Sequence, residues 1–187
     1  DSNTNIANYN NFATLSGNSL TLPVQTLIDL LSSPQNVVLQ ANNDITLNRA
    51  LIVNNLAGNG GSLTMQAGRS IILNNSITTD NGNLTLIAND TTVNGVVSNQ
   101  RDSGNAVITM GSDTFINAGS GNVNITLNNS SNASGDITIK DISANSITVG
   151  NKGKSSGSDV ILSGTLTASD SGTPVIIYTI NGSFSNN

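Results

Sequence analysis

The chain of 187 residues contains no cysteine, no histidine, no tryptophan and no glutamate. Without histidine and cysteine, Ser-His-Asp and Cys-His catalytic arrangements are excluded, and so are metal sites built on His or Cys ligands. The lack of cysteine also excludes disulfides, which suits either a reduced cytosol or a secreted protein that avoids them. We therefore expect no catalytic residue, no metal ligand and no cofactor, and a protein that is not an enzyme.

Charge is scarce as well. Charged residues make up 9% of the chain, with six Lys+Arg against eleven Asp+Glu and a net charge of −5, whereas soluble proteins have about 25%. This set would not neutralise a phosphate backbone, so we expect no nucleic-acid partner. A carbohydrate-cleaving enzyme needs paired carboxylates or a Lys/Arg base with bound calcium. Asp136 and Asp141 are a pair that a short strand could bring near each other, but nothing in the sequence fixes that geometry.

Long apolar segments and aromatic residues are missing too. No apolar run approaches the roughly 20 residues of a membrane span, and no basic stretch followed by an apolar one opens the chain. We therefore expect Asp1 to begin a processed or excised fragment. Only Tyr9 and Phe12 form a close aromatic pair. Sugar-binding modules usually present exposed rings, but we expect this pair to pack over one end of the fold.

The chain does contain a repeat. Segments with apolar residues at alternate positions occupy residues 37–41, 63–67, 84–88, 106–110 and 123–127. Alternation with a period of two predicts β-strands. Between these units lie turns rich in Gly, Asn and Asp, such as residues 58–61, 80–82 and 119–121, and these residue types accept the positive φ angles of sharp corners.

Equivalent residues recur after one unit, as they do after one circuit of a coiled chain. Stacked units predict an interior row made of Leu39, Met65, Leu86, Ile108 and Leu127. A second row, where small residues let the wall bend, is predicted from Ala41, Ala67 and Ala88. The next apolar residues after the third and fourth units are Val93 and Phe115. We expect each of them to occupy the interior position that Ile71 occupies in the second unit.

This recurrence predicts an all-β fold, a right-handed parallel β-helix (a single-stranded solenoid) with one short α-helix near the N-terminus. The alternative is a β-sandwich of antiparallel hairpins, which gives no reason for the recurrence. The helix is expected within residues 23–31, where apolar residues have helical spacing and Pro precedes them. Residues 13–15 and 19–22 are expected to form a hairpin before it.

Two regions follow from these patterns. Residues 1–35 are expected to form the hairpin and the short helix, which must pack on the stack because two turns are not stable alone. Residues 36–187 are expected to form the coils, regular to about residue 127 and irregular after it.

The asparagine residues lead to two further predictions, a side-chain ladder and possible glycosylation sites. Asn48, Asn74 and Asn94 each follow a coil strand, so we expect their side chains to form a hydrogen-bonded ladder rather than a ligand site. Asn-x-Ser/Thr sequons, which are possible glycosylation sites, occur at Asn74, Asn83, Asn89, Asn124, Asn128, Asn129, Asn132 and Asn181.

The run from Leu22 to Asn48, with its helix followed by Asn36-Val-Val-Leu-Gln-Ala-Asn-Asn-Asp-Ile-Thr-Leu, resembles a module of the filamentous-haemagglutinin-like exoproteins of two-partner secretion. Residues 61–68 and 82–89 are similar to the β-helix coils of that family, and residues 174–186 to segments that close such blocks. The family's secretion domain carries Asn-Pro-Asn motifs, which this chain lacks. The resemblance therefore covers a shaft or a downstream module.

The resemblance implies an exported Gram-negative surface protein, often an adhesin with a role in cell adhesion and virulence. We accordingly expect an extracellular, non-catalytic structural or adhesive segment of a large secreted bacterial surface protein. Its expected partners are a receptor or glycan on a host or neighbouring cell, copies of itself end to end, and an outer-membrane transporter during export. The alternatives are a carbohydrate-binding or carbohydrate-processing β-helix and a self-assembling filament subunit, since the open ends of a β-helix invite stacking.

Overall fold

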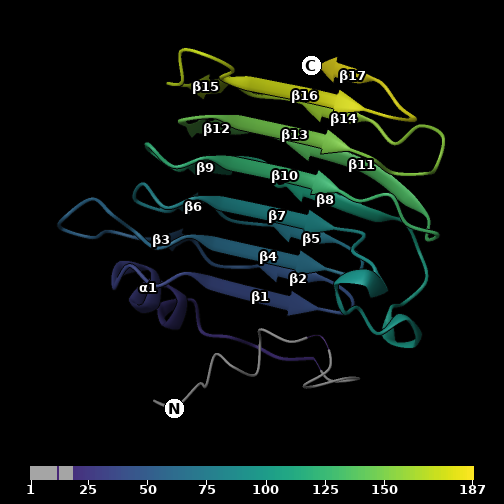
Figure 1. Cartoon of the computed structure of the whole chain (residues 1–187), viewed down its shortest axis with the longest axis horizontal. Helices are drawn as coiled ribbons and strands as arrows, with labels where there is room; N and C mark the ends of the chain where they lie inside the picture. Colours follow the sequence, from purple (N-terminus) through teal and green to yellow (C-terminus); the bar gives the residue numbers. More distant parts are fainter. Residues whose placement is uncertain (1–11, 13–18) are drawn as a thin grey trace.

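The structure is a computed structural model that describes Phe12 and residues 19–187. In these residues the strands form three sheets of six, six and five strands, here named A, B and C, and every strand pair is parallel (Figure 1). Each coil of the chain contributes one strand to each sheet in turn, so neighbouring strands in a sheet come from successive coils. The predicted parallel β-helix is therefore confirmed, and a sandwich of antiparallel hairpins is excluded.

The strands are short and evenly distributed over the three sheets. Sheet A contains β1 (Val37–Ala41), β4 (Leu63–Ala67), β7 (Leu84–Ala88), β10 (Val123–Leu127), β13 (Ile147–Asn151) and β16 (Val175–Thr179). Sheet B contains β2 (Ile45–Leu47), β5 (Ile71–Leu73), β8 (Ala106–Met110), β11 (Ser134–Ile139), β14 (Val160–Leu162) and β17 (Phe184–Asn186). Sheet C contains β3 (Leu51–Ile52), β6 (Ile77–Thr78), β9 (Phe115–Asn117), β12 (Asp141–Ala144) and β15 (Leu166–Ala168).

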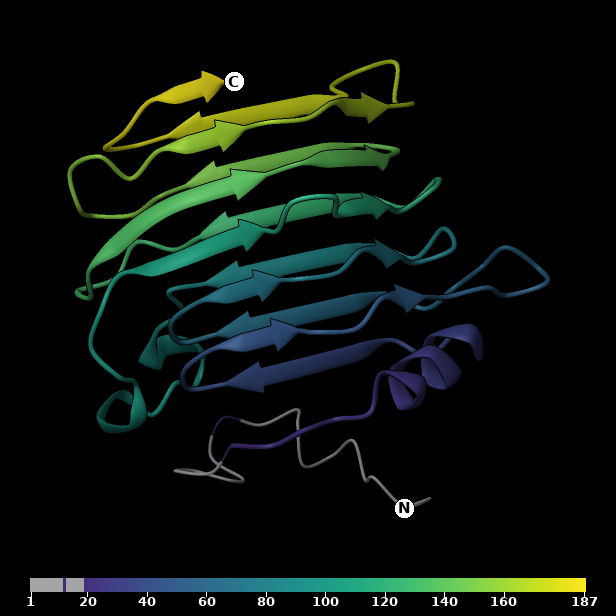
Figure 2. The same ribbon diagram turned by 180° about the vertical axis from the view of Figure 1, so that it is seen from behind.

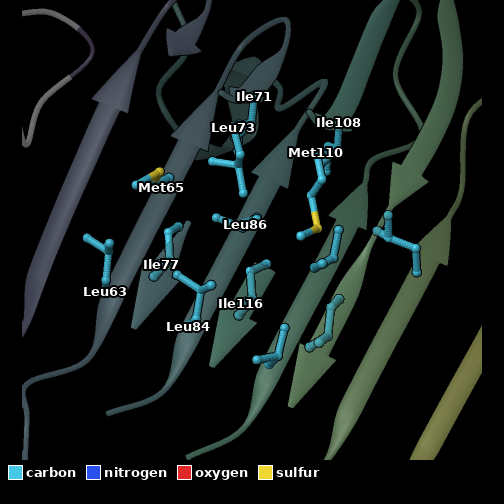
Figure 3. Packing of buried hydrophobic residues seen from close by; sticks show 14 of the residues in the cluster. Leu63, Met65, Ile71, Leu73, Ile77, Leu84, Leu86, Ile108, Met110 and Ile116 are labelled. Carbon is cyan, nitrogen blue, oxygen red and sulfur yellow. The ribbon is translucent and has the colours of Figure 1, made fainter. Parts of the chain in front are cut away.

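The sheets enclose a flattened core. In Figure 1 the strands of sheet A run from left to right on the near side, the chain returns behind them, and each later coil lies higher, so the winding is right-handed. Seen from behind, the strands of sheets B and C follow one another along the opposite wall (Figure 2). Alternate residues point inward because side chains alternate along a strand. Figure 3 shows residues such as Leu84, Leu86 and Ile116 meeting between the two walls.

The interior rows differ from the predicted ones after the third coil. Leu39, Met65 and Leu86 do stack, but the next member of the row is Ile125 and not Ile108. Ile108 belongs to sheet B, where it pairs with Ile71. The alternating patterns of β7 and β8 are alike, so alternation alone does not tell which sheet a strand joins.

A second correction follows from the same register. Leu127 pairs with Ala88 and therefore extends the alanine row instead of the leucine row. In that row Ala41 and Ala67 pair as predicted. Beyond residue 127 the pairing continues, with Val123 opposite Ile147 and Ile147 opposite Val175.

An excursion of residues 89–105 separates β7 from β8 and is the reason for the wrong register. It contains two 3₁₀ turns, η2 (Thr92–Asn94) and η3 (Ser98–Gln100), and packs beside the first coils (Figure 1). Val93, the expected interior residue, is 90% exposed on η2, whereas Val96 is buried. The Asn42 amide joins the excursion to the stack, because its Oδ1 accepts the Val97 N–H and its Nδ2 donates to Gln100.

The α-helix α1 (Val24–Ser32) lies at the N-terminal end of the stack (Figure 2). Leu27 and Leu31 are buried against the first coil, which agrees with the predicted apolar stripe. Residues 19–22 form no strand, and the other arm of the predicted hairpin lies outside the described residues, as does Tyr9. Phe12 is buried, and its carbonyl accepts the Asn42 amide.

The corners combine positive φ angles with close backbone approach. Positive φ angles occur at Gly58, Asp80, Asn81 and Gly119, as predicted. Gly61, Gly82 and Gly121 do not have them. These three glycines are stacked instead, and a Cβ on Gly82 would lie 2.1 Å from the Gly61 carbonyl oxygen.

Candidate functional site

Two adjoining hollows lie at the surface beside sheet C. The smaller lies over strands β9, β12 and β15, and the larger over the corners that lead into these strands. Their volumes are about 260 and 540 Å³. Phe115 and Asp141 line both of them, so we describe the two together as the Phe115 groove. The side chains around it include an aromatic ring, carboxylates, an ammonium group, hydroxyls and an amide, so an apolar surface lies beside several hydrogen-bonding groups.

Phe115 reaches this surface because the corner before β9 is long. In the coil below, Leu73 and Ile77 face the core with a short corner between them, whereas residues 111–114 form a full turn in this coil. In that turn both the N–H and the hydroxyl of Thr114 donate to the Gly111 carbonyl. Ile116 then faces inward, and Phe115 is 42% exposed. The sequence pattern predicted that Phe115 would lie in the interior, and this prediction was wrong.

Asp141 lies directly above Phe115, as its pairing partner in β12. Its Oδ1 accepts the backbone N–H of Thr165 at 2.7 Å, which holds the carboxylate against the next coil. Within the described part of the chain, Oδ2 accepts no hydrogen bond and remains available to a ligand. Gly164 makes this arrangement possible, because a Cβ there would lie 2.7 Å from Asp141 Oδ1.

The larger hollow adds charged groups of both signs. Asp113 and Lys140 line it together with Asp141. Lys140 Nζ donates to Ser163 Oγ at 2.6 Å and keeps further N–H groups for other acceptors. The smaller hollow is lined on its far side by the outward row Asn117, Ser143 and Thr167, which are paired along β9, β12 and β15.

Asp136 and Asp141, the two carboxylates that a short strand could bring together, lie on different sheets. Asp141 stands on sheet C, and Asp136 belongs to β11 of sheet B, where its Oδ1 accepts the Asp159 N–H at 3.0 Å. Each carboxylate thus binds the backbone of the coil above it. Sequence reasoning missed the groove itself, because its side chains come from three coils. The one available signal was Phe115, the aromatic residue of the regular repeat region.

The predicted asparagine ladder forms in part. Asn74 Nδ2 donates to Asn48 Oδ1 at 2.8 Å on the exposed surface. Asn94 is not part of this ladder, because it belongs to the excursion, where its amide donates to Asp90. Asn48 and Asn74 are therefore structural, and the ladder ends after two residues.

The sequon asparagines differ in exposure. Five are exposed, namely Asn74, Asn83, Asn124, Asn129 and Asn181, and two are partly buried, namely Asn128 and Asn132. Asn89 is fully buried, and its Nδ2 donates to the Asn128 carbonyl at 3.0 Å. A glycan on that nitrogen would require the excursion to open. Glycosylation at the exposed sites stays a prediction.

Other charged groups have structural contacts. Arg69 forms a bidentate pair with Asp44 of the previous coil, with contacts of 2.9 and 2.6 Å. Burial of the Asp44 carboxylate opposes ionisation, but the hydrogen bonds from Arg69 and Ser70 outweigh it and lower the pKa of Asp44. Arg101 donates to the Gly68 carbonyl, and burial together with nearby Arg69 lowers its pKa.

Asp90 is a buried acid at the start of the excursion. Its Oδ1 accepts hydrogen bonds from Thr91, Asn94 and Asn128, whereas its buried Oδ2 has no partner in the described residues. Within the same residues, no group of three or more acidic side chains is arranged to hold a metal ion. No helix there is long and apolar enough to cross a membrane.

No protein-family model, curated protein sequence or solved structure matches the chain. The fold and the Phe115 groove therefore stand on the chain's own residues.

Proposed function

We propose that the chain is a non-catalytic segment of a large secreted bacterial surface protein, in which it forms an extracellular stalk with adhesive faces. The observation that carries this proposal is the unbroken in-register pairing of sheet A from β1 to β16. Backbone hydrogen bonds between coils run along the stacking axis, so a pull along the stalk is shared by many of them.

The surface of the stack also suits contact with a polar partner. Outward positions of sheet A are uncharged, and Gln40 and Gln66 are joined by a hydrogen bond of 2.7 Å. Rows of hydroxyl and amide groups at the strand spacing of about 4.8 Å offer regularly placed donors and acceptors. Such a surface resists nonspecific charge attraction and favours directional hydrogen bonds.

The solenoid supports export by an outer-membrane transporter. Each coil pairs only with its two neighbours, so the stack can grow coil by coil as the chain emerges. The helix α1 covers the first coil and gives this growth a defined beginning. The family resemblance of residues 22–48 is in accord with this route.

Adhesion is tested with beads coated with the whole chain and presented to cultured epithelial cells and to bacterial cells. Beads coated with an unrelated β-helix of similar charge serve as the control. We expect the chain to increase bead retention at least about tenfold over the control. Equal retention on every cell type would contradict an adhesive function.

Two alternatives are separated by simple measurements. A carbohydrate-processing β-helix would release reducing ends or unsaturated products from a polysaccharide panel, and we expect none. A self-assembling filament would sediment as long polymers. The helix α1 disfavours head-to-tail stacking, because Leu27 and Leu31 already cover the apolar face of the first coil. We therefore expect analytical ultracentrifugation to show one species of defined size rather than long polymers.

A further inference from the structure

We propose that the Phe115 groove binds a neutral oligosaccharide of at least two sugar units. This inference rests on the proposed adhesive function and names the chemistry of its ligand. It does not require the chain to cleave the sugar.

The aromatic ring supplies the first argument. Among the described residues, the exposed aromatic side chains are Phe115 and Phe184, and Phe115 lines both hollows of the groove, whereas Phe184 lines neither. The face of an aromatic ring carries partial negative charge. One face of a pyranose ring presents C–H bonds, so it stacks on such a ring and releases water from both surfaces.

The polar groups supply the second argument. Sugar hydroxyls are donors and acceptors together, and they need partners of both kinds. The free Oδ2 of Asp141 accepts from hydroxyls, and such a charge-assisted hydrogen bond is stronger than a neutral one. The hydroxyls of Ser143 and Thr167 and the amide of Asn117 offer both donor and acceptor atoms on the other side of the ring.

The size and charge of the groove limit the kinds of sugar that it can bind. The two hollows of about 260 and 540 Å³ meet at Phe115 and Asp141, so a ligand that fills both spans more than one sugar unit. Two carboxylates, Asp113 and Asp141, stand against one ammonium group, Lys140, which leaves the groove with a negative balance. Sialylated, sulfated and uronic-acid sugars are therefore disfavoured relative to neutral ones.

The groove is also held ready for a ligand. The Asp141 carboxylate is fixed by its hydrogen bond to the Thr165 N–H, and Lys140 by its bond to Ser163. The Phe115 N–H donates to Ser76 Oγ of the coil below at 3.0 Å. Binding therefore orders few additional side chains, which lowers its entropic cost.

The test uses the whole chain on an array of neutral and anionic oligosaccharides, followed by titration calorimetry with the best neutral tetrasaccharide. We expect binding of neutral glycans, with amide NMR shifts concentrated at residues 115–117, 141–143 and 165–167. Phe115→Ala and Asp141→Asn should each weaken binding at least about tenfold. Both variants keep the fold, since Phe115 is partly exposed and an Asn side chain still accepts the Thr165 N–H. Phe184→Ala, at an exposed aromatic residue outside the groove, should leave binding unchanged.

Several outcomes would overturn the inference: no neutral glycan bound at millimolar concentration, a preference for anionic glycans, or binding that neither groove variant weakens. The bead assay separates this failure from that of the proposed function. If Phe115→Ala beads adhere as well as wild-type beads, the adhesive stalk stands and the groove is not its binding site. If wild-type beads do not adhere although glycans bind in the groove, the adhesive function fails and the sugar site stands.

Discussion

At the scale of single residues, the abundant Asn, Asp and Ser side chains have a shared task at the coil corners. Several of them accept the backbone N–H of the next coil at the point where a strand begins. Asn36 accepts from Ser62, and Asn83 accepts from Asn122, both at the entrance to sheet A. Asp159 in turn accepts from Ser183 at the entrance to sheet B. Short polar side chains satisfy N–H groups that a bend in the ladder would otherwise leave without partners.

The Asp44–Arg69 pair makes stability depend on pH at this scale. The pKa of Asp44 is lower in the folded chain than its ordinary value of 3.8, so the unfolded chain binds the proton more tightly. The stabilisation is therefore fully present above pH 3.8 and is lost as the pH falls through the folded-state pKa. For this partly exposed pair we expect less than about 1 kcal/mol.

Urea denaturation checks this prediction by giving the free energy of unfolding of wild type and of Asp44→Asn at about five pH values between about pH 2 and pH 7. The variant still has an acceptor for the Ser70 N–H, so the comparison isolates the charge. We expect the variant to be less stable at neutral pH and equal to wild type at the acidic end. A difference that stays constant over the whole range would contradict a role for the Asp44 charge.

At the scale of the elements, stacked glycines set how closely successive corners approach. A Cβ on Gly61, Gly82 or Gly121 would lie 2.0, 2.1 or 2.3 Å from a carbonyl oxygen of the corner below. No side chain tolerates such a contact with backbone. These corners therefore need glycine for space, whereas Gly58 is needed for its positive φ angle.

Gly82→Ala should accordingly destabilise the chain by about 3 kcal/mol, because the corner must move away from the Gly61 carbonyl and weaken the pairing of β4 with β7. Gly172→Ala is the matched control, since its nearest neighbour would lie at 3.5 Å and its φ is not positive. Thermal unfolding followed by circular dichroism measures both. Equal melting temperatures for the two variants would show that the corner column is not tightly packed.

The helix α1 contributes as a cover for the first coil. Leu31 is fully buried, so Leu31→Ala should cost about 2–5 kcal/mol and expose the apolar end of the stack. Leu20→Ala, at a residue that is 46% exposed, should cost much less. Chemical denaturation gives the stabilities, and light scattering should show self-association of Leu31→Ala alone. A variant that loses stability but stays monomeric would refute the cover role.

At the scale of the whole molecule, the interior row of sheet A that begins at Val37 stays buried up to Ile147 and becomes exposed in the last coil. Val123 and Val175 belong to the same row of sheet A, and they are 1% and 37% exposed. The difference arises because Val123 has coils on both sides, whereas β16 is the outermost strand of its sheet. Equivalent positions in the repeat are thus unequal in energy.

We therefore expect Val123→Ala to cost about 2 kcal/mol and Val175→Ala less than about 1 kcal/mol, since the buried apolar area lost differs. The same substitution in the same row removes differences in side-chain chemistry. Urea denaturation of both variants measures the two costs. Similar losses at the two positions would mean that burial along the row is uniform in solution.

Much of the fold followed from local pattern. The alternation of apolar residues predicted the strands of the first three coils, and the apolar spacing between Pro23 and Pro34 predicted α1. The register failed at the excursion, because residues 89–105 place Ala106 about as far after Leu84 as Leu84 lies after Leu63, and they include the apolar Val93. Pairing of β10 with β7 is a contact between distant segments, so no local pattern records it.

The sequence by itself determined the strand periodicity, the scarcity of charge and the lack of His, Cys and Glu, because these are properties of neighbouring residues and of composition. The tertiary structure alone decided which strands lie in one sheet and which side chains share a surface. Phe115, Asp141 and Thr167 come from three successive coils, and only the stacking of β9, β12 and β15 brings them to one groove. Parallel pairing joins residues that are about one coil apart in the sequence. This separation depends on the length of the corners between the strands, which differs from coil to coil.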